Sequence, residues 1–345
     1  MQHFDVFWAD QAGNKVAEVA RREETGRVRL NADADLPLGA EILVHDVPDW
    51  VDPYQHRVLV ERSGHPLGLF LVGAEGLATK RSDRQHRLTL LDPLKLADTY
   101  RLTKPVTVAA GVNVVNKVVE LVKLTGETRL AVTPSDAVTL APQVWMPGET
   151  TLKTVVNELL GSINYWGLHT NRLGEFVIAP YVLPADRPVV HEFIAGDGSK
   201  LLGEYDSERD FYTVPNRFIA VCDDYKPQGN DDADPVTLVG VAENRNPDSV
   251  FSFEARGNRW VDEYDQVEAT SQKDIDGIAA RRLAAITGGG DYVDVSYSPE
   301  VDLWRDDLVH VVTAAGDDYL ATVNELEIPE HGLVRAKLRK VVGLA

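Results

Sequence analysis

Residues 147–181 read PGETTLKTVVNELLGSINYWGLHTNRLGEFVIAPY, and this stretch combines a helix with a hairpin. Thr150 or Thr151 is suited to cap the helix, because a threonine hydroxyl accepts a hydrogen bond from a backbone N–H of the first turn. One apolar face is predicted from residues at helical spacing, namely Leu152, Val155, Val156, Leu159, Leu160 and Ile163. Residues 165–170, the turn 171–174 and residues 175–178 then predict two short strands. The stretch therefore indicates a small α+β unit.

A second helix is predicted upstream of this stretch, after Pro105. Its apolar face consists of Val114, Val115, Val118, Leu121 and Val122. Gly126 is expected at the C′ position that follows the helix. A proline-rich run over 180–188 ends the unit on the other side. We therefore predict an α+β domain over residues 103–188.

The chain before this unit has the pattern of β-structure. Short apolar or alternating runs occupy residues 27–30, 41–44, 57–61, 68–72 and 87–91. Turn residues separate them at 37–39, 52–53 and 63–66. Several short strands at regular spacing are typical of a barrel or a sandwich. We predict that residues 1–102 form a first β-barrel domain.

The chain after residue 189 is again rich in β patterns. Alternating runs lie at 292–297, 308–312, 319–323 and 334–338. A helix is predicted near 271–286, with Ser271 as its cap and the glycines at 288–290 as its end. Its inner face is expected to hold Ile275, Ile278, Ala279, Leu283 and Ile286. We predict a second β-barrel domain over 189–345, with an acidic loop and this helix, so the fold class is mixed β and α+β.

Charge and cysteine content narrow the class of function. The formal net charge of the 345-residue chain is −19, which argues against a protein that grips nucleic acid through a basic face. The one cysteine, Cys222, lies in the run 217–222, which predicts a buried strand, and we expect it to be a small core residue. A chain with one cysteine fits production in a reducing cytoplasm. Neither a secretion signal nor an apolar stretch long enough to span a bilayer is expected.

The sequence motifs that carry common catalytic chemistry are missing. The chain has no Gly-x-Ser-x-Gly, no phosphate-binding P-loop and no His-Glu-x-x-His. Its nine histidines are scattered, and no pair shows metal-ligand spacing on a helix. We therefore predict no catalytic, cofactor-binding or metal-binding residues, and no cofactor.

Two groups of carboxylates are candidates for an exception. One suits a hard cation such as calcium and comprises Asp231, Asp232 and Asp234, with Asp223 or Asp224 nearby. A solvated acidic loop is the favoured interpretation of this group. The other consists of Asp302, Asp306 and Asp307, which flank Trp304 and could act as a glycosidase pair. We expect no enzymatic role for it.

Aromatic residues around the predicted hairpin have two interpretations. They are Trp145, Tyr165, Trp166 and Phe176. They could line a sugar-binding groove. The favoured interpretation is that they close the small core of the α+β unit, because aromatics supply much buried area in small domains.

Several segments together resemble a known family. They are residues 148–160, 163–166, 174–181, 207–210 and 214–217, followed by the C-terminal segment 295–303. In these segments the chain resembles the hub, or tail-tip, proteins of tailed bacteriophages, especially minor tail proteins of long-tailed actinobacterial phages (siphophages). The resemblance covers about residues 105–345 and extends to 1–104 only through their β character. Where family members carry Gly-Asp before a barrel strand, this chain has Arg305-Asp306, which puts the turn geometry there in doubt.

The resemblance implies an architecture and a function. Hub proteins of this type carry two tube-type β-barrels with an intervening α+β domain and assemble as homotrimers that mimic a six-fold ring. Such a baseplate hub closes the tail tube in the virion, links it to a tail fibre or spike, and leaves a lumen for genome ejection. The implied partners are the adaptor ring (distal tail) protein, the tape-measure protein and a fibre or tip protein. Viral DNA would pass without specific binding, and no membrane span is implied.

Charge adds one hypothesis to this picture. Part of the negative charge of the chain could face the lumen, where it would let DNA slide. The acidic run 203–234 would contribute to it, or would form a solvated outer loop. These two interpretations remain open.

Three alternatives to a hub were weighed. The first is an adaptor ring protein of the same tail, with six-fold symmetry. The second is a cell-wall-degrading glycosidase or peptidase, which the lack of a nucleophile, base or metal set disfavours. The third is a carbohydrate-binding module that uses Trp145 and Trp166.

Overall fold

The computed structural model of the chain describes residues 3–21, 26–80, 83–148, 150–196, 201–202, 214–225, 234–288, 292–314 and 316–341. The first β-rich part contains β1 (Phe4–Ala9), β2 (Lys15–Glu18), β3 (Arg27–Asn31), β4 (Leu38–Val44), β5 (Arg57–Arg62), β6 (His65–Lys80) and β7 (Asp83–Leu91). The second contains β13 (Val189–Ile194), β14 (Leu201–Leu202), β18 (Tyr292–Tyr297), β19 (Leu308–Val312), β20 (Asp318–Pro329) and β21 (Val334–Lys340).

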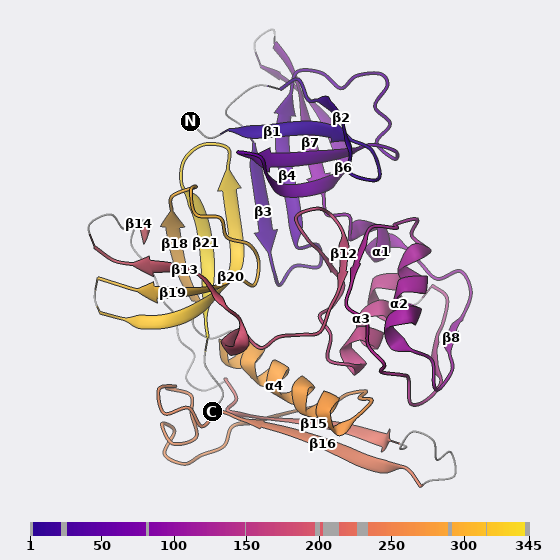
Figure 1. Cartoon of the computed structure of the whole chain (residues 1–345), viewed down its shortest axis with the longest axis vertical. Helices are drawn as coiled ribbons and strands as arrows, with labels where there is room; N and C mark the ends of the chain where they lie inside the picture. Colours follow the sequence, from indigo (N-terminus) through magenta and orange to yellow (C-terminus); the bar gives the residue numbers. More distant parts are fainter. Residues whose placement is uncertain are drawn as a thin grey trace.

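The two β-rich parts form one continuous sheet. Its strand order is β14-β18-β21-β20-β3-β4-β7-β6-β5-β1-β2, and β19 and β13 branch from β20. The junction is the antiparallel pairing of β3 with β20, from Asn31 opposite Glu325 to Arg27 opposite Pro329. Figure 1 shows these strands side by side between the upper part and the left part of the molecule. A single apolar core, with Trp8 from β1 and Leu338 from β21 among its members, lies beneath both parts.

In the first β-rich part, the residues that follow β2 pair again with β1 and β4. After β2, the amide of Val19 donates to the carbonyl of Val6 at 2.8 Å. Arg21 then forms an isolated bridge with Val44 at the end of β4, and the His45 amide donates to the Ala20 carbonyl at 2.9 Å. Strand pairing therefore continues from β4 through β7, β6, β5 and β1 to residues 19–21, which pair with the end of β4.

The α+β unit lies on the other side of the molecule (Figure 1). It contains α1 (Lys95–Thr99), β8 (Val106–Val108), α2 (Val114–Lys123), β9 (Leu130–Val132), β10 (Gln143–Trp145), α3 (Leu152–Ser162), β11 (His169–Thr170), β12 (Phe176–Ile178) and the 3-10 helix η1 (Pro184–Asp186). Its core is formed by the predicted faces of α2 and α3, which pack against Phe176 and Ile178. The predicted cap is present, because the Thr151 hydroxyl accepts from the Thr154 amide at 3.2 Å.

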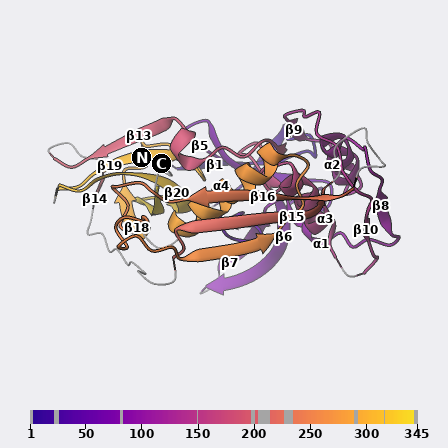
Figure 2. The ribbon, with the colours of Figure 1, turned by 90° about the horizontal axis from the view of Figure 1, so that it is seen from below.

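A fourth unit interrupts the second β-rich part. It contains β15 (Arg217–Tyr225), β16 (Val236–Glu243), β17 (Asp262–Gln266) and α4 (Gln272–Gly288). The strands form a sheet of their own in the order β16-β15-β17, and Figure 2 shows β15 and β16 side by side across the molecule. Helix α4 covers one face, where Phe218, Ala220 and Cys222 pack against its buried residues.

The structure confirms some of the sequence-based predictions and corrects others. The nine strands predicted in the two β-rich parts lie within observed strands, and the β-rich class with few helices is confirmed. The predicted hairpin strands 165–170 and 175–178 are observed only as the shorter β11 and β12. Gly126 does not occupy C′ but the next position, since Leu124 is the C-cap of α2. The run 217–222 lies in β15 as predicted, with Phe218, Ala220 and Cys222 buried in the core and the residues between them partly exposed. Closure into two barrels and the domain limits 1–102, 103–188 and 189–345 stay predictions.

Among the described residues, no helix combines the length with the apolar character that crossing a bilayer requires.

Candidate functional site

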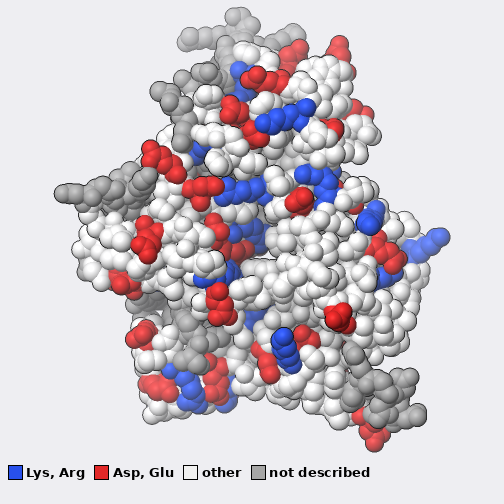
Figure 3. Space-filling view, in the orientation of Figure 1, with Lys and Arg blue, Asp and Glu red and all other residues white. Residues whose placement is uncertain are grey.

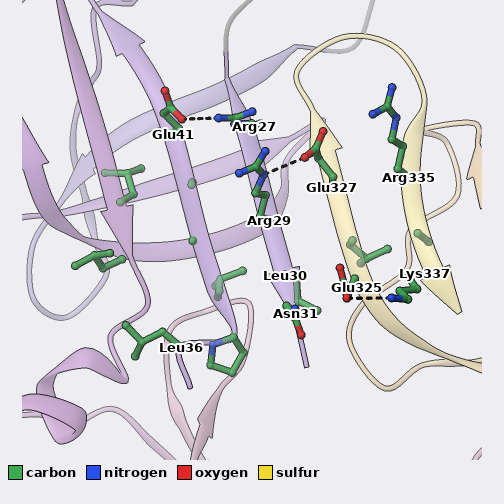
Figure 4. A pocket seen from close by; sticks show the side chains of 18 of the residues that line it. Arg27, Arg29, Leu30, Asn31, Leu36, Glu41, Glu325, Glu327, Arg335 and Lys337 are labelled. Carbon is green, nitrogen blue, oxygen red and sulfur yellow. Dashed lines mark hydrogen bonds and ion pairs between the residues drawn. The ribbon is translucent and has the colours of Figure 1, made fainter. Parts of the chain in front are cut away.

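A groove of about 840 Å³ crosses the continuous sheet. It runs over β4, β3, β20, β21 and β18, so it spans the junction between the two β-rich parts. Figure 4 shows its charged side chains standing in rows on neighbouring strands. On the face seen in Figure 3, acidic and basic side chains alternate over the same junction.

Strand alternation explains why this face is charged. In β3, Val28 and Leu30 are buried in the core, so Arg27 and Arg29 point to the opposite side. The same period of two repeats in the four other strands. It buries Ala40 and Ile42, Leu326 and Ile328, Ala336 and Leu338, and Val293 and Val295. It turns outward Glu41, Glu325, Glu327, Arg335, Lys337 and Asp294.

The charged side chains face residues of opposite sign across the strands. Arg27 lies opposite Glu41 in the register, and Arg29 lies opposite Glu327. Their side chains form ion pairs of 2.8 Å and 3.0 Å, drawn as dashed lines in Figure 4. The carboxylate of Glu41 also meets Arg87 of β7 at 3.1 Å.

The pattern continues across β20, β21 and β18. Glu327 lies opposite Arg335, and Glu325 lies opposite Lys337, whose amino group is 3.9 Å from the carboxylate of Glu325. Lys337 in turn lies opposite Asp294 of β18. Opposite charges placed directly across neighbouring strands stabilise their pairing by roughly 0.2–1 kcal/mol each.

The groove has no net charge. Its lining holds four basic residues (Arg27, Arg29, Arg335 and Lys337) and four acidic ones (Glu41, Asp294, Glu325 and Glu327). The hydrogen bond from Arg27 is the main reason why the pKa of Glu41 lies below its ordinary value, and the charges of Arg27, Arg87 and Arg29 add to it. The charged side chains of the wall therefore balance one another over the pH range in which the carboxylates are ionised, and apolar residues such as Leu36 and Leu91 line the groove beside them.

The carboxylates that sequence reasoning weighed as a glycosidase pair are engaged in separate contacts. Asp302 pairs with Arg172 at 2.6 Å, and Asp306 contacts Arg305 at 3.0 Å. Asp307 accepts a hydrogen bond from the Trp304 amide at 2.6 Å, and burial raises its pKa. Asp306 has a φ of 63°, a left-handed conformation that aspartate tolerates better than most residues. The turn that differs from the family pattern is thus built on Asp306.

The acidic cluster falls partly outside the described residues, which include Asp223, Asp224 and Asp234. Asp231 and Asp232 lie outside them, as does most of the run 203–234, while Asp223 bonds to Thr237 and Gln266. Within the described ranges, no group of three or more His, Cys, Asp or Glu residues is placed to hold a metal ion.

The aromatic residues divide between two environments. Tyr165 and Phe176 are buried in the α+β core, and Trp145 packs against its edge with its indole donating to Glu158 at 2.6 Å. The core interpretation is wrong for Trp166, which lies instead against Tyr181 with ring centroids 4.4 Å apart.

Sequence reasoning missed the charged groove, although part of the signal was present. The alternation Arg27-Val28-Arg29-Leu30 places two basic residues on one face of a strand. That Glu327 supplies the opposite charge follows only from the β3–β20 pairing, which no local pattern specifies.

Comparisons with known proteins bear on the fold. No protein-family model matches the sequence, and no curated protein does. Among solved structures, the chain is similar to the tail protein from Neisseria meningitidis, with a TM-score of 0.66 and 13% identity over 98% of this chain and 96% of that one. This chain has a tail-protein fold.

Two further structures share this fold. The prophage MuSo2 tail protein from Shewanella oneidensis gives a TM-score of 0.61 and 11% identity over 97% of this chain and 98% of that one. The E. coli c3393 protein is a component of the type VI secretion system with structural similarity to the T4 tail proteins gp27 and gp5. It gives a TM-score of 0.52 and 10% identity, over 94% of this chain and 74% of that one. The likeness to these tail proteins extends along nearly the whole chain, whereas the two barrels and the narrower resemblance to actinobacterial phages stay predictions.

Proposed function

We propose that this chain is a structural protein of a phage-type tail, located in the virion, and that it forms the ring-shaped hub at the end of the tail tube. The observation that carries the proposal is the charge-balanced groove on a sheet that runs without interruption through both β-rich parts. The tail-protein fold, shared along nearly the full length of the Neisseria and Shewanella proteins, supports it.

A ring with a central conduit needs walls that expose a hydrophilic face to the conduit and keep an apolar face covered. The continuous sheet has these two faces, because its core side is buried beneath both β-rich parts and its groove side is lined by ion pairs. In the proposed assembly, the groove faces of the subunits line the conduit.

Two barrel-like units in each subunit would let three copies match a six-fold tube. The return of residues 19–21 to β4 supports such a unit in the first part, because it leaves that run of strands with few open edges. In the second part, β13 pairs in parallel with β19 and with no other described strand, so it is a candidate edge for contact with a neighbouring subunit.

The balance of charges changes the expectation for the conduit wall. One hypothesis from the sequence is that part of the negative charge faces the lumen and lets DNA slide, but the groove holds four charges of each sign. Duplex DNA gains affinity when free cations replace its counterions. Because Arg27, Arg29 and Lys337 already face carboxylates, they have little to offer a phosphate backbone. We propose that DNA passes because the wall is neutralised by its own ion pairs.

The native mass of the purified assembly tests the proposal. One subunit is 38.1 kDa, so a three-fold hub has a mass near 114 kDa by native mass spectrometry. A hexamer of twice that mass would instead favour an adaptor ring of the same tail. A chain that stayed monomeric in the presence of its tail partners would contradict both. Those partners are proposed to be an adaptor ring protein, a tape-measure protein and a fibre or tip protein.

A further inference from the structure

A second cavity, of about 460 Å³, lies where the α+β unit, α4 and the C-terminal strands meet. Its walls come from α3, the segment 181–187, α4 and β20–β21. Six of its lining residues are basic, namely Arg187, Arg281, Arg282, Arg305, Arg339 and Lys340. Three are acidic, namely Asp33, Asp186 and Asp306. A cavity with this positive excess is unexpected in a chain whose net charge is −19.

Two of the acidic residues are occupied by three of the arginines. Asp33 pairs with Arg339 at 2.7 Å. Asp306 meets Arg305 at 3.0 Å and Arg187 at 3.7 Å. Each of these contacts neutralises charge inside the cavity, but Arg281 takes part in none of them.

Arg281 is a cation without a counterion in the part of the chain that the structure describes. Its guanidinium donates one hydrogen bond, to the backbone carbonyl of Tyr165 at 2.8 Å, and no carboxylate of the described residues lies within 4.0 Å of it. Burial, together with the positive charge of Arg282, lowers the pKa of Arg281 from its ordinary value. A partly buried cation that lacks a counterion is energetically unfavourable, and an anion beside it would relieve that cost.

Neighbouring groups in the wall also have N–H donors to spare. Nη1 of Arg305 and Nε of Arg339 are buried and have no hydrogen-bond partner in the described part of the chain. Aromatic rings hold other guanidiniums in place, since Arg187 lies 5.1 Å from the ring centroid of Trp166 and Arg281 lies 5.5 Å from that of Tyr181. The cavity thus holds six basic side chains against three carboxylates, and buried N–H groups of Arg305 and Arg339 have no acceptor among the described residues.

We propose that this cavity binds the carboxylates of an acidic peptide segment from a partner protein. The planar fork of a guanidinium matches a carboxylate with two parallel hydrogen bonds. A volume of about 460 Å³ accommodates a few side chains and is too small for a nucleic-acid duplex. The net charge of the chain repels a long polyanion as well. The proposal stands apart from the hub function, because it needs only the cavity.

Binding of a fluorescein-labelled tetraglutamate peptide to the full chain, followed by fluorescence anisotropy, tests the proposal. Wild-type protein binds this peptide and not a tetraglutamine peptide of the same length. Arg281→Met weakens binding by at least about tenfold. The matched control, Arg245→Met, removes an exposed arginine that pairs with Glu243 at 2.8 Å, and leaves binding unchanged.

A second variant keeps every arginine and places a carboxylate of the chain itself in the cavity. Ala285 is an exposed residue of α4 that lines the cavity, so Ala285→Glu supplies a carboxylate in place of the peptide. This variant folds as wild type does and no longer binds tetraglutamate, and it decides the question if Arg281→Met fails to fold. Equal binding by wild type and both variants would overturn the proposal. So would the absence of wild-type binding, or binding of inorganic phosphate without binding of the peptide.

Discussion

Leu30 of β3 lies directly opposite Leu326 of β20, and both side chains are buried in the same core. This pairing joins a strand from the beginning of the chain to one from its end. It merges the two β-rich parts into one sheet, and it places the charges of β3 beside those of β20 in the groove. The two parts are therefore expected to unfold together.

Truncating the side chain of Leu326 tests whether the two β-rich parts share one core. Leu326→Ala removes buried methyl groups and should destabilise the protein by about 2–5 kcal/mol. Denaturant unfolding followed by tryptophan fluorescence should show one transition at a lower midpoint, because Trp8 belongs to the same core. Leu333→Ala, at an exposed position, is the control and should shift the midpoint little. Two separate transitions would show that the β-rich parts are independent.

The buried carboxylate of Glu330, in the second β-rich part, contacts Arg21 and Gly26 of the first part. Glu330 follows β20, pairs with Arg21 at 2.6 Å and accepts a hydrogen bond from the Gly26 amide at 3.0 Å. Glu330→Gln leaves the buried guanidinium of Arg21 without its counterion, so we expect a loss of about 3–5 kcal/mol in the free energy of unfolding.

Its control is an exposed ion pair. Glu254→Gln breaks a contact of 3.3 Å with Arg245, both of them about half exposed, and should cost about 1 kcal/mol or less. Similar midpoints for the two variants in urea would argue that Glu330 has no such role.

Much of the local structure could be predicted from the sequence, because burial repeats with a clear period. The buried face of α2 is the set of valines and leucines expected from its spacing, and the alternation of β3 places Val28 and Leu30 inside. Strand β1 escaped prediction although Phe4, Val6 and Trp8 alternate and are all buried. The signal was present there and was not used.

Long-range pairing was beyond prediction for a physical reason. A strand pattern specifies which face is buried but not which distant strand lies alongside, so the β3–β20 junction and the groove could not be derived. The fourth unit shows the same limit, because the pattern of 217–222 did not indicate that β16, β17 and α4 pack on it as a separate body within the second β-rich part.

The free energy of unfolding should depend on pH because of the titration of His169. Burial is the main cause that lowers its pKa from 6.5 to about 4. Since the folded state holds a proton less tightly than the unfolded state, this group favours folding above pH 6.5. That contribution is lost as the pH falls toward 4.

His169→Asn removes this titration and should flatten the stability curve between those pH values, by up to about 1.4 kcal/mol per pH unit. Urea midpoints measured at several pH values for both proteins check the difference. Parallel curves would mean that His169 does not titrate in this way.

Removing three of the four acidic side chains of the groove should create affinity for DNA. The triple variant Glu41→Gln, Glu325→Gln and Glu327→Gln frees Arg27, Arg29 and Lys337 from their partners. We expect duplex DNA to bind this variant at low salt, with an affinity that falls steeply as salt rises, and to bind wild type much more weakly.

The matched control changes net charge by the same amount elsewhere, with Glu120→Gln, Glu243→Gln and Glu254→Gln. Anisotropy of a labelled duplex over a range of salt concentrations separates the two variants. Equal binding by both would show that net charge alone, and not the pairing in the groove, governs the affinity.

Electron cryo-microscopy of the assembled protein, at a resolution that places individual strands, tests the central claim most directly. We predict a closed ring of three copies in which β3, β4, β20 and β21 turn their charged face to the central channel, with Glu327 and Arg335 at its surface. A ring in which this face is buried against a neighbour or points outward would contradict the account.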